Sequence, residues 1–265
     1  MSTEKFVSFS QEDAVGYVTL HRPPENRANR KFVTDLGDAI REAALSEVRA
    51  LVINAEGDHF CMGGDFREWP TYDSYQKRKE RWQFSNGILS ALENLTIPTI
   101  ASVHGRANGF GFELALRTDF VVASEQANFR FPEATIAVFP LAGGVQRIAE
   151  RAGRNVANRI VMLSEDLSAM EAHKLNIVSK VVPHGRIVDE TVALAKKLAE
   201  GPTRAHAATK ALLAAWASGG ITHADSQMME LIPVILDTED VRAGIDMAAK
   251  LAVGAARPTL KFSGK

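Results

Sequence analysis

Hydrophobic and polar residues alternate at the start of this chain. Further along, short continuous apolar runs are separated by stretches in which apolar residues recur at helical spacing. The alternation over Phe6–Phe9 and Ala14–Leu20 predicts two strands, joined by a turn at Gln11–Asp13. Short apolar runs that are typical of buried strands follow at 50–53, 98–103 and 120–123.

Between these strands, apolar residues recur at helical spacing. The pattern predicts helices near 30–45 and 73–93, and a shorter helix over Phe110–Arg117. Strands that alternate with helices in this way indicate an α/β fold with parallel pairing of the strands.

After about residue 185 the chain becomes helical and rich in alanine. The expected helices cover 187–199, 203–217 and the residues up to Val253, with glycine breaks at 201 and 219–220. We therefore predict a core domain over 1–200 and a helical region over 201–265. The apolar residues of the helical region either form a subunit interface or cover the core of their own chain.

The composition is that of an ordinary globular protein. Of 265 residues, 46% are hydrophobic and 24% charged, and 31 Lys and Arg against 32 Asp and Glu leave a net charge of -1. This balance gives no reason to expect a nucleic acid or a membrane surface as a partner. Cys61 is the one cysteine, so no intrachain disulfide is possible, and no signal-peptide or membrane-spanning pattern occurs. A cytoplasmic location is therefore expected.

Two glycine-containing segments are candidates for ligand binding. Phe60–Asp65 has two adjacent glycines after a buried strand, where the backbone can approach a ligand closely, although a tight turn has the same requirement. The strand at 98–103 runs through glycines into the helix that bears Glu113, and the N-terminal amides of a helix suit an oxyanion hole. This segment is neither a dinucleotide fingerprint nor a P-loop. Apolar residues flank Glu113, so a solvent-exposed position is hard to assign to it.

A second carboxylate, Glu133, follows Pro132 in an aromatic stretch. Desolvation there would raise its pKa and suit it to proton transfer, and a helix-capping role is the alternative. No metal-ligand spacing of Cys and His, no H-E-x-x-H and no G-x-S-x-G occurs in the sequence, so no metal is expected.

Taken together in this order, the segments resemble the crotonase superfamily, also called the enoyl-CoA hydratase/isomerase family. The similarity runs from Leu20–Pro24 to Arg257–Pro258. Its most specific part, Ile97–Leu116, is similar to the family signature K-P-x-I-A-A-V-x-G-x-A-x-G-G-G-x-E-L-A-L.

The resemblance implies a crotonase-type ββα spiral core that binds acyl-CoA, with C-terminal helices that build a homotrimer or a dimer of trimers. Coenzyme A would be part of the substrate, with no separate cofactor. The thioester carbonyl would be polarised by the backbone N–H groups of Met62 and Phe110, with Glu113 and Glu133 as the catalytic pair. Having both carboxylates favours hydration of a trans-2-enoyl-CoA to a 3-hydroxyacyl-CoA.

Further residues that match the family's substrate-binding and CoA-binding positions are Arg27, Ala28, Gly63, Asp65, Gly109, Pro140 and Leu141. Bulky residues stand where the family pattern has small ones, at Met62, Phe110 and Leu141. They would either reshape the acyl pocket or point away from it. The first possibility leaves isomerisation, decarboxylation or C–C cleavage of an acyl-CoA open. A non-catalytic or RNA-binding relative is the remaining alternative, which the mixed charges over 30–45 disfavour.

Overall fold

A six-stranded sheet forms the centre of the molecule. The computed structural model describes residues 5–252, 255–256, 258 and 260–265. The strands of the sheet are β1 (Val7–Glu12), β2 (Val15–Leu20), β3 (Ala50–Ala55), β4 (Thr99–Val103), β6 (Phe120–Ser124) and β9 (Lys180–Val182). They lie in the order β1-β2-β3-β4-β6-β9, with β1 and β2 antiparallel and the following neighbours parallel. The predicted α/β architecture with parallel pairing is confirmed.

The hairpin between β1 and β2 closes later than the sequence pattern predicted. Gln11 and Glu12 belong to β1, and Glu12 pairs with Val15. The turn therefore consists of Asp13 and Ala14, and Asp13 has a φ of +52°, a left-handed conformation that Asp tolerates. The predicted turn at Gln11–Asp13 was wrong because a two-residue turn leaves both preceding polar residues paired in the strand.

Short strands that the hydrophobic pattern did not reveal form a second sheet. They are β5 (Arg106–Asn108), β7 (Asn128–Arg130) and β8 (Asp166–Ser168), in the order β5-β7-β8. An isolated parallel bridge joins Cys61 to Ala107. A Cβ atom on Gly63 would lie 3.1 Å from the carbonyl oxygen of Asn108. The two glycine segments thus lie against each other.

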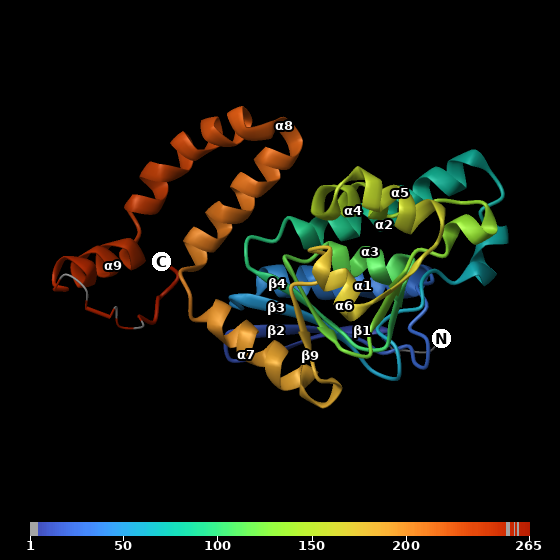
Figure 1. Ribbon diagram of the computed structural model, residues 1–265, viewed down its shortest axis with the longest axis horizontal. Helices are drawn as coiled ribbons and strands as arrows, with labels where there is room; N and C mark the ends of the chain where they lie inside the picture. Colours follow the sequence, from blue (N-terminus) through green and yellow to red (C-terminus); the bar gives the residue numbers. More distant parts are fainter. Residues whose placement is uncertain (1–4, 253–254, 257, 259) are drawn as a thin grey trace.

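Helices cover both faces of the main sheet (Figure 1). The α-helices of the core are α1 (Arg30–Leu45), α2 (Tyr75–Glu93), α3 (Phe110–Leu116), α4 (Gly144–Ala152), α5 (Arg154–Met162), α6 (Ala169–Lys174) and α7 (Ile187–Ala199). Short 3-10 helices are η1 (Phe66–Thr71), η2 (Glu133–Ile136) and η3 (His184–Arg186). The predicted helices near 30–45, 73–93 and 110–117 are confirmed.

The side chains of β3 point alternately to the two faces of the main sheet, and each face carries its own apolar cluster. Leu51 and Ile53 belong to the larger apolar cluster, to which α1, α2 and α3 contribute. Ala50 and Val52 face the opposite side and pack in a smaller cluster with residues of α7. Successive side chains of a strand point to opposite faces, so a continuous apolar run is what a sheet covered on both sides requires.

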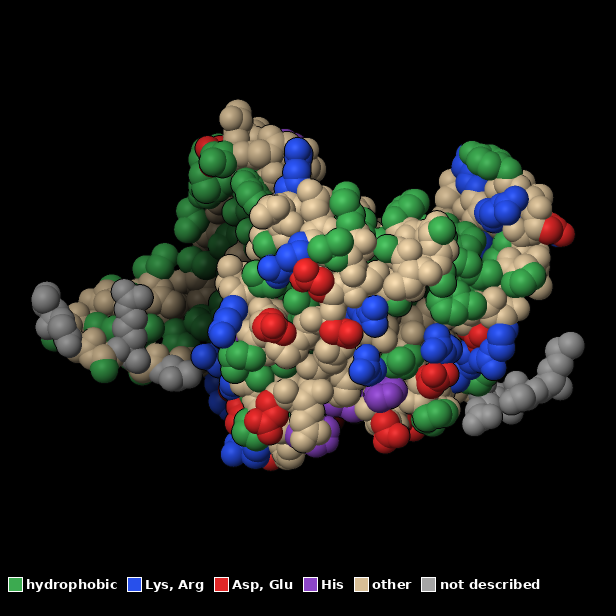
Figure 2. All heavy atoms as spheres, turned by 45° about the vertical axis from the view of Figure 1, so that its right-hand side comes forward, with side chains coloured by type: hydrophobic (Ala, Val, Ile, Leu, Met, Phe, Trp, Pro, Cys, Tyr) green, Lys and Arg blue, Asp and Glu red, His purple; other side chains and the backbone are tan. Residues whose placement is uncertain are grey.

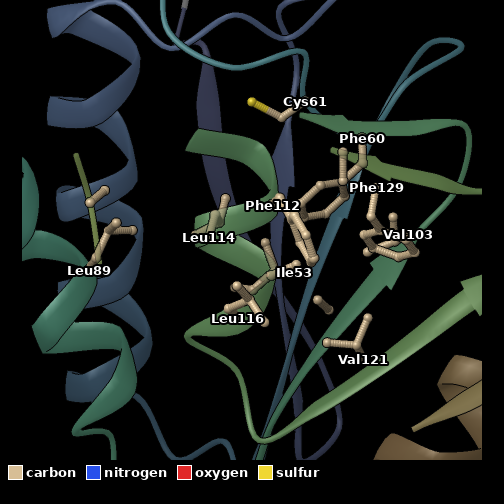
Figure 3. Packing of buried hydrophobic residues seen from close by; sticks show 14 of the residues in the cluster. Ile53, Phe60, Cys61, Leu89, Val103, Phe112, Leu114, Leu116, Val121 and Phe129 are labelled. Atoms are coloured by element: carbon tan, nitrogen blue, oxygen red, sulfur yellow. The ribbon is translucent and has the colours of Figure 1, made fainter. Parts of the chain in front are cut away.

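Phe112 anchors helix α3 in the larger core (Figure 3). Its ring stacks on Phe131, with ring centroids 4.6 Å apart, and its centroid lies 5.1 Å from that of Phe129. The neighbouring Gly111 leaves no room for a side chain, because a Cβ atom there would lie 2.2 Å from the Cys61 carbonyl oxygen. These contacts hold the start of α3 against the first glycine segment.

The C-terminal helices α8 (Thr203–Leu236) and α9 (Glu239–Ala249) extend away from the core as an arm (Figure 1). Gly220 interrupts α8 with φ +74° and ψ -172°, which confirms the predicted glycine break. Exposed large hydrophobic residues of the arm are Leu213, Trp216, Ile221, Met229, Ile232, Val234, Leu236 and Ile245. Figure 2 shows hydrophobic side chains gathered on this arm.

The domain boundary after residue 200 and the oligomeric role of the arm stay predictions. Val253 and Arg257, where the helical pattern and the family resemblance approach their ends, lie outside the described residues. Within the described parts of the chain, none of the helices combines the length and the apolar character needed to cross a membrane.

Candidate active site

Helix α3 places Glu113 inside the protein. Gly109 precedes the helix with φ +48° and ψ -119°, a conformation that favours glycine. Glu113 is only 2% exposed. Its Oε1 accepts hydrogen bonds from the backbone N–H groups of Ala142 (2.7 Å) and Gly144 (2.9 Å). One oxygen of this buried carboxylate is therefore oriented by two donors from a distant loop.

Two opposed effects act on the pKa of Glu113. Burial raises this pKa to about 7, while the amides of Gly144 and Ala142 act to lower it. The amides donate only to an acceptor, so they stabilise the ionised form. At neutral pH the Glu113 carboxylate is therefore populated although it is desolvated.

Glu133 reaches the same pocket from a different kind of element. It opens the 3-10 helix η2 directly after Pro132, and among the described residues its buried Oε2 has no hydrogen-bond partner. Its Oε1 occupies space that a side chain on Gly109 would need, since a Cβ atom there would lie 2.6 Å away. Burial, and secondly the charge of Glu113, raise the pKa of Glu133 to about 7.

The backbone N–H groups near the two carboxylates differ in one position from the predicted oxyanion donors. Met62 and Phe110 were the expected oxyanion donors, but the Met62 N–H already donates to the carbonyl of Glu25 at 2.8 Å. Gly64 has an N–H with no acceptor in the described part of the chain. Phe110 is the first residue of α3, so its N–H has no acceptor within the helix. Gly64 and Phe110 thus each present to the site an N–H that has no acceptor among the described residues.

An isolated bridge between Ala28 and Gly64 explains which amide is left over. Ala28 donates to the carbonyl of Gly63 at 2.8 Å, and Asp65 donates to the carbonyl of Ala28 at 3.1 Å. In such a parallel bridge, the residue between the two bonded neighbours directs its own N–H the other way. The Gly64 amide consequently faces away from Ala28.

A buried network behind the pocket holds the loop that supplies the donors to Glu113. Arg117 is 5% exposed and donates to the carbonyl of Ala142 (2.8 Å) and to Glu93 (2.8 Å). Arg147 donates to both carboxylate oxygens of Glu93 (2.7 and 2.5 Å) and to a carbonyl of the same loop (3.0 Å). Fixing the carbonyls of a loop also fixes its amides.

The carboxylates and the glycine segments border one pocket of about 250 Å³. The predicted residues in its lining are Arg27, Ala28, Met62, Gly63, Asp65, Gly109, Phe110, Glu113, Glu133 and Leu141. Pro140 is buried and is not part of the lining. All three bulky substitutions of the family pattern, at Met62, Phe110 and Leu141, border the pocket. The binding roles of these residues stay predictions.

Two charged residues of this set have protein partners. Arg27 pairs with Glu25, with Nε 2.8 Å from Oε2. Asp65 is held by Arg67 at 2.7 Å and by Arg22 at 2.9 Å, and these hydrogen bonds keep the pKa of Asp65 well below its usual range. Both residues therefore order the first glycine segment, and in this conformation Arg27 offers no unpaired positive charge to a phosphate.

A further wall of the pocket comes from η1 and the first half of α2. Its residues are Phe66, Glu68, Trp69, Tyr72, Arg81, Trp82 and Ser85. The sequence pattern assigned Trp82 to an apolar helix face and gave the others no role. Their convergence depends on how η1 and α2 pack across the glycine segments, which no local pattern shows. Within the described residues, no group of three or more His, Cys, Asp and Glu side chains is placed to hold a metal ion.

Comparison with known proteins identifies the family. Residues 10–252 match the family model described as enoyl-CoA hydratase/isomerase. The chain is 31% identical over 242 residues to 2,3-dehydroadipyl-CoA hydratase of Escherichia coli (strain K12), covering 89% of this chain and 92% of that protein. It is 31% identical over 235 residues to carnitinyl-CoA dehydratase of Salmonella enteritidis PT4, covering 86% and 88%.

Solved structures agree with this result over nearly the whole chain. A solved structure from Geobacillus kaustophilus HTA426, named enoyl-CoA hydrates subunit I, superposes with a TM-score of 0.90 at 30% identity, covering 98% of both chains. An enoyl-CoA hydratase of Mycobacterium smegmatis superposes with a TM-score of 0.88 at 26% identity, covering 93% of this chain and 97% of that one. The chain therefore belongs to the enoyl-CoA hydratase/isomerase family, the crotonase superfamily of acyl-CoA enzymes.

Proposed function

We propose that this protein is an enoyl-CoA hydratase, which adds water to a trans-2-enoyl-CoA to give a 3-hydroxyacyl-CoA. The observation that carries the proposal is the presence of Glu113 and Glu133 in one pocket, each with a pKa raised to about 7. Groups that titrate near neutral pH both accept and donate protons effectively. Two relatives are named as a hydratase and a dehydratase, which supports the same class of reaction.

The amides of Gly64 and Phe110 are the proposed oxyanion hole. When water adds to C3, electron density moves through the double bond onto the thioester oxygen. Unpaired N–H donors that already point at this position stabilise the enolate charge without rearranging. Gly64 takes the role first expected of Met62, because the Met62 amide is occupied by Glu25.

Glu113 is the proposed base and Glu133 the proposed acid. The amides of Ala142 and Gly144 favour the carboxylate form of Glu113, which removes a proton from water as its oxygen bonds to C3. Glu133 lacks such donors on Oε2, so it holds a proton and delivers it to C2 as the enolate collapses. One water is consumed, and transfer of a proton from Glu113 back to Glu133 restores the starting state.

Replacing each carboxylate tests the mechanism. With crotonyl-CoA or a longer trans-2-enoyl-CoA, we expect Glu113→Gln and Glu133→Gln each to lower kcat/KM by about 10²- to 10⁴-fold, the usual contribution of a general acid or base. Glu150→Gln, on the exposed side of α4, is the matched control and should keep the wild-type rate. The product should be heavier than the substrate by one water. A wild-type rate in either active-site variant would exclude the two-carboxylate mechanism.

Another crotonase-type reaction is the second candidate, because Met62, Phe110 and Leu141 all border the pocket. Isomerisation leaves the mass of the thioester unchanged, whereas decarboxylation or C–C cleavage lowers it. Product masses from a panel of acyl-CoA substrates therefore separate these reactions from hydration.

The proposed partners are an acyl-CoA and further copies of the same chain, with no nucleic acid or membrane. Figure 2 shows basic and acidic side chains intermixed over the visible face, which is unlike a phosphate-binding surface. Exposed large hydrophobic side chains gather on α8 and α9 (Figure 2), and such clusters are typical of interfaces, which supports a homotrimer or a dimer of trimers. Light scattering measures the mass of the protein in solution. The mass of a monomer at micromolar protein concentration would contradict the proposed homotrimer or dimer of trimers.

A further inference from the structure

The wall formed by η1 and α2 leads from the oxyanion amides to a positive charge. Trp69 lies next to Gly64, since a Cβ atom on Gly64 would be 3.8 Å from the Trp69 indole nitrogen. The rings of Trp69 and Trp82 meet edge to face with centroids 5.7 Å apart, and those of Trp82 and Tyr72 at 5.8 Å. Arg81 lies beyond them, with its guanidinium carbon 5.8 Å from the centroid of the Tyr72 ring. An acyl chain that follows this wall passes aromatic surface before it meets Arg81.

Arg81 borders the pocket without an acidic partner. Its Nε donates to the Tyr72 hydroxyl at 3.1 Å, and its Nη1 donates to the Ser85 hydroxyl. Across the described residues, no Asp or Glu oxygen lies within ion-pair distance of Arg81, and its Nη2 has no acceptor. The other arginine in the pocket lining, Arg27, is neutralised by Glu25.

Glu68 is the nearest opposing charge on this wall. It accepts from the Tyr72 hydroxyl at 3.2 Å and from the backbone N–H of Arg30 at 2.7 Å, both at Oε2. Tyr72 therefore stands between Glu68 and Arg81 and connects them by hydrogen bonds rather than by direct contact. Glu68 orients the tyrosine, while the unused donor of the wall is the Arg81 Nη2. A guanidinium with a free edge is suited to a planar oxyanion.

We propose that the acyl chain of the substrate ends in a carboxylate that is bound by the guanidinium of Arg81, with Ser85 and Tyr72 holding that guanidinium in place. The inference rests on the proposed function and narrows its substrate to enoyl-CoA thioesters of dicarboxylic acids. The aromatic rings accommodate the methylene groups between the reacting carbons and the carboxylate. A cationic chain end is disfavoured, because the Arg81 charge would repel it inside a partly dehydrated pocket.

A matched pair of substrates tests the proposal. trans-2-Hexenoyl-CoA and the mono-CoA thioester of trans-2-hexenedioic acid differ only in a terminal methyl or carboxylate. We expect wild-type kcat/KM to favour the carboxylate substrate by about 10- to 100-fold, the range expected for hydrogen bonds to a charged group. In Arg81→Gln this ratio should fall toward one, and Arg81→Lys should keep part of it because the charge remains. Arg78→Gln, an exposed arginine one turn earlier on α2, is the matched control and should keep the wild-type ratio.

The ratio of kcat/KM for the carboxylate substrate to that for the methyl substrate distinguishes a contact between Arg81 and the acyl chain from other roles of Arg81. Both substrates carry the same CoA, so a contact between Arg81 and a CoA phosphate, or a loss of folding, would lower both rates equally. An equal loss in Arg81→Gln would overturn the proposal, as would a wild-type preference for the methyl substrate or for an analogue ending in trimethylammonium.

Binding of saturated analogues distinguishes failure of this inference from failure of the hydratase proposal. Hexanoyl-CoA and the mono-CoA thioester of hexanedioic acid have no double bond, so their Kd values report recognition without chemistry. Quenching of Trp69 and Trp82 fluorescence is one readout, and calorimetry is another. If wild-type protein binds the carboxylate analogue at least tenfold more tightly but hydrates neither enoyl substrate, the inference stands and the hydratase proposal fails. Equal Kd values would overturn the inference whatever the activity.

Discussion

Glu113 and Glu133 are the same residue type in the same pocket, yet their surroundings differ. Glu113 lies on an α-helix and accepts two backbone amides through Oε1, whereas Glu133 lies on a 3-10 turn and has a buried Oε2 without a partner. Burial raises the pKa of both to about 7. Burial thus makes both carboxyl groups titrate near neutral pH. The hydrogen-bond donors to Glu113 then favour its ionised form, so Glu133 is the group that holds the proton.

The largest effect that separates the two carboxylates is expected from Arg117→Met. Removing this buried guanidinium leaves the carbonyl of Ala142 without its donor and leaves Glu93 paired with Arg147 alone. Losing two hydrogen bonds from a charged donor, each worth about 1.5–3 kcal/mol, should lower the free energy of unfolding by about 3–5 kcal/mol. The loop that supplies the donors to Glu113 would loosen. The pKa of Glu113 should then rise, and the acid limb of the kcat/KM profile should move to higher pH.

Urea denaturation and pH–rate profiles measure these two results for Arg117→Met. The control is Arg186→Met, which removes an exposed ion pair with Glu190 and should leave the unfolding free energy nearly unchanged. An acid limb that stays in place in a folded Arg117→Met protein would show that the amides hold Glu113 without help from this network.

On the Glu133 side, the next largest effect is expected from Gly109→Ala. The added Cβ would lie 2.6 Å from Glu133 Oε1 and must displace that carboxylate. Misplacing a catalytic group by about 1 Å costs roughly 10²-fold in rate, so kcat/KM should fall by about that factor. Gly153→Ala is the control, because Gly153 also has a positive φ (+86°) but nothing within 4 Å of the added atom. Equal losses in the two variants would assign the effect to backbone strain.

The pH dependence should be bell-shaped with a maximum near pH 7. Activity requires ionised Glu113, so it is lost as the pH falls, and it requires protonated Glu133, so it is lost as the pH rises. Each limb should approach tenfold per pH unit, and the limbs belong to the coupled pair rather than to isolated groups.

Single variants of the pair sharpen this test. The residual activity of Glu133→Gln should lack the alkaline limb. That of Glu113→Gln should lack the acid limb, and its alkaline limb should move to lower pH because the charge that raised the pKa of Glu133 is gone. A profile that both variants share with the wild type would contradict the assignment of acid and base.

The smallest effect is expected at the end of the turn that carries Glu133. Ala137 has a φ of +59°, a left-handed conformation that costs a non-glycine residue about 1 kcal/mol. Ala137→Gly should therefore raise the free energy of unfolding by up to about 1 kcal/mol. Ala134→Gly, in the same turn without a positive φ, is the control and should lower it. Chemical denaturation compares the two, and a loss of stability in Ala137→Gly would contradict the expected relief of strain.

Much of the fold was predictable because its elements have local causes. Helices α1, α2 and α3 and the strands β3, β4 and β6 follow apolar spacing, and Gly220 breaks α8 where a glycine pair indicated it. The second sheet was not predictable, since its strands are three residues long and pair with partners far apart in the sequence. Runs of that length carry too few residues to show a period.

The candidate site was likewise predictable only in part. The resemblance to the crotonase family pointed to Glu113 and Glu133 as the catalytic pair, and the structure places both in one pocket. The oxyanion donor was assigned to Met62, because no sequence pattern shows that Glu25 accepts its N–H and that a bridge to Ala28 leaves the Gly64 amide unpaired.

The sequence by itself thus determined strands β2, β3, β4 and β6, helices α1, α2, α3 and α7, the glycine segments and, through the family resemblance, the two carboxylates. Only the tertiary structure decided which amide is free, which carboxylate receives donors from the loop at 142–144, and that Arg81 stands in the pocket without an acid. The physical reason is one of range. Spacing and turn chemistry act between near neighbours, whereas desolvation and hydrogen-bond partners are supplied by residues that become neighbours only when the chain folds.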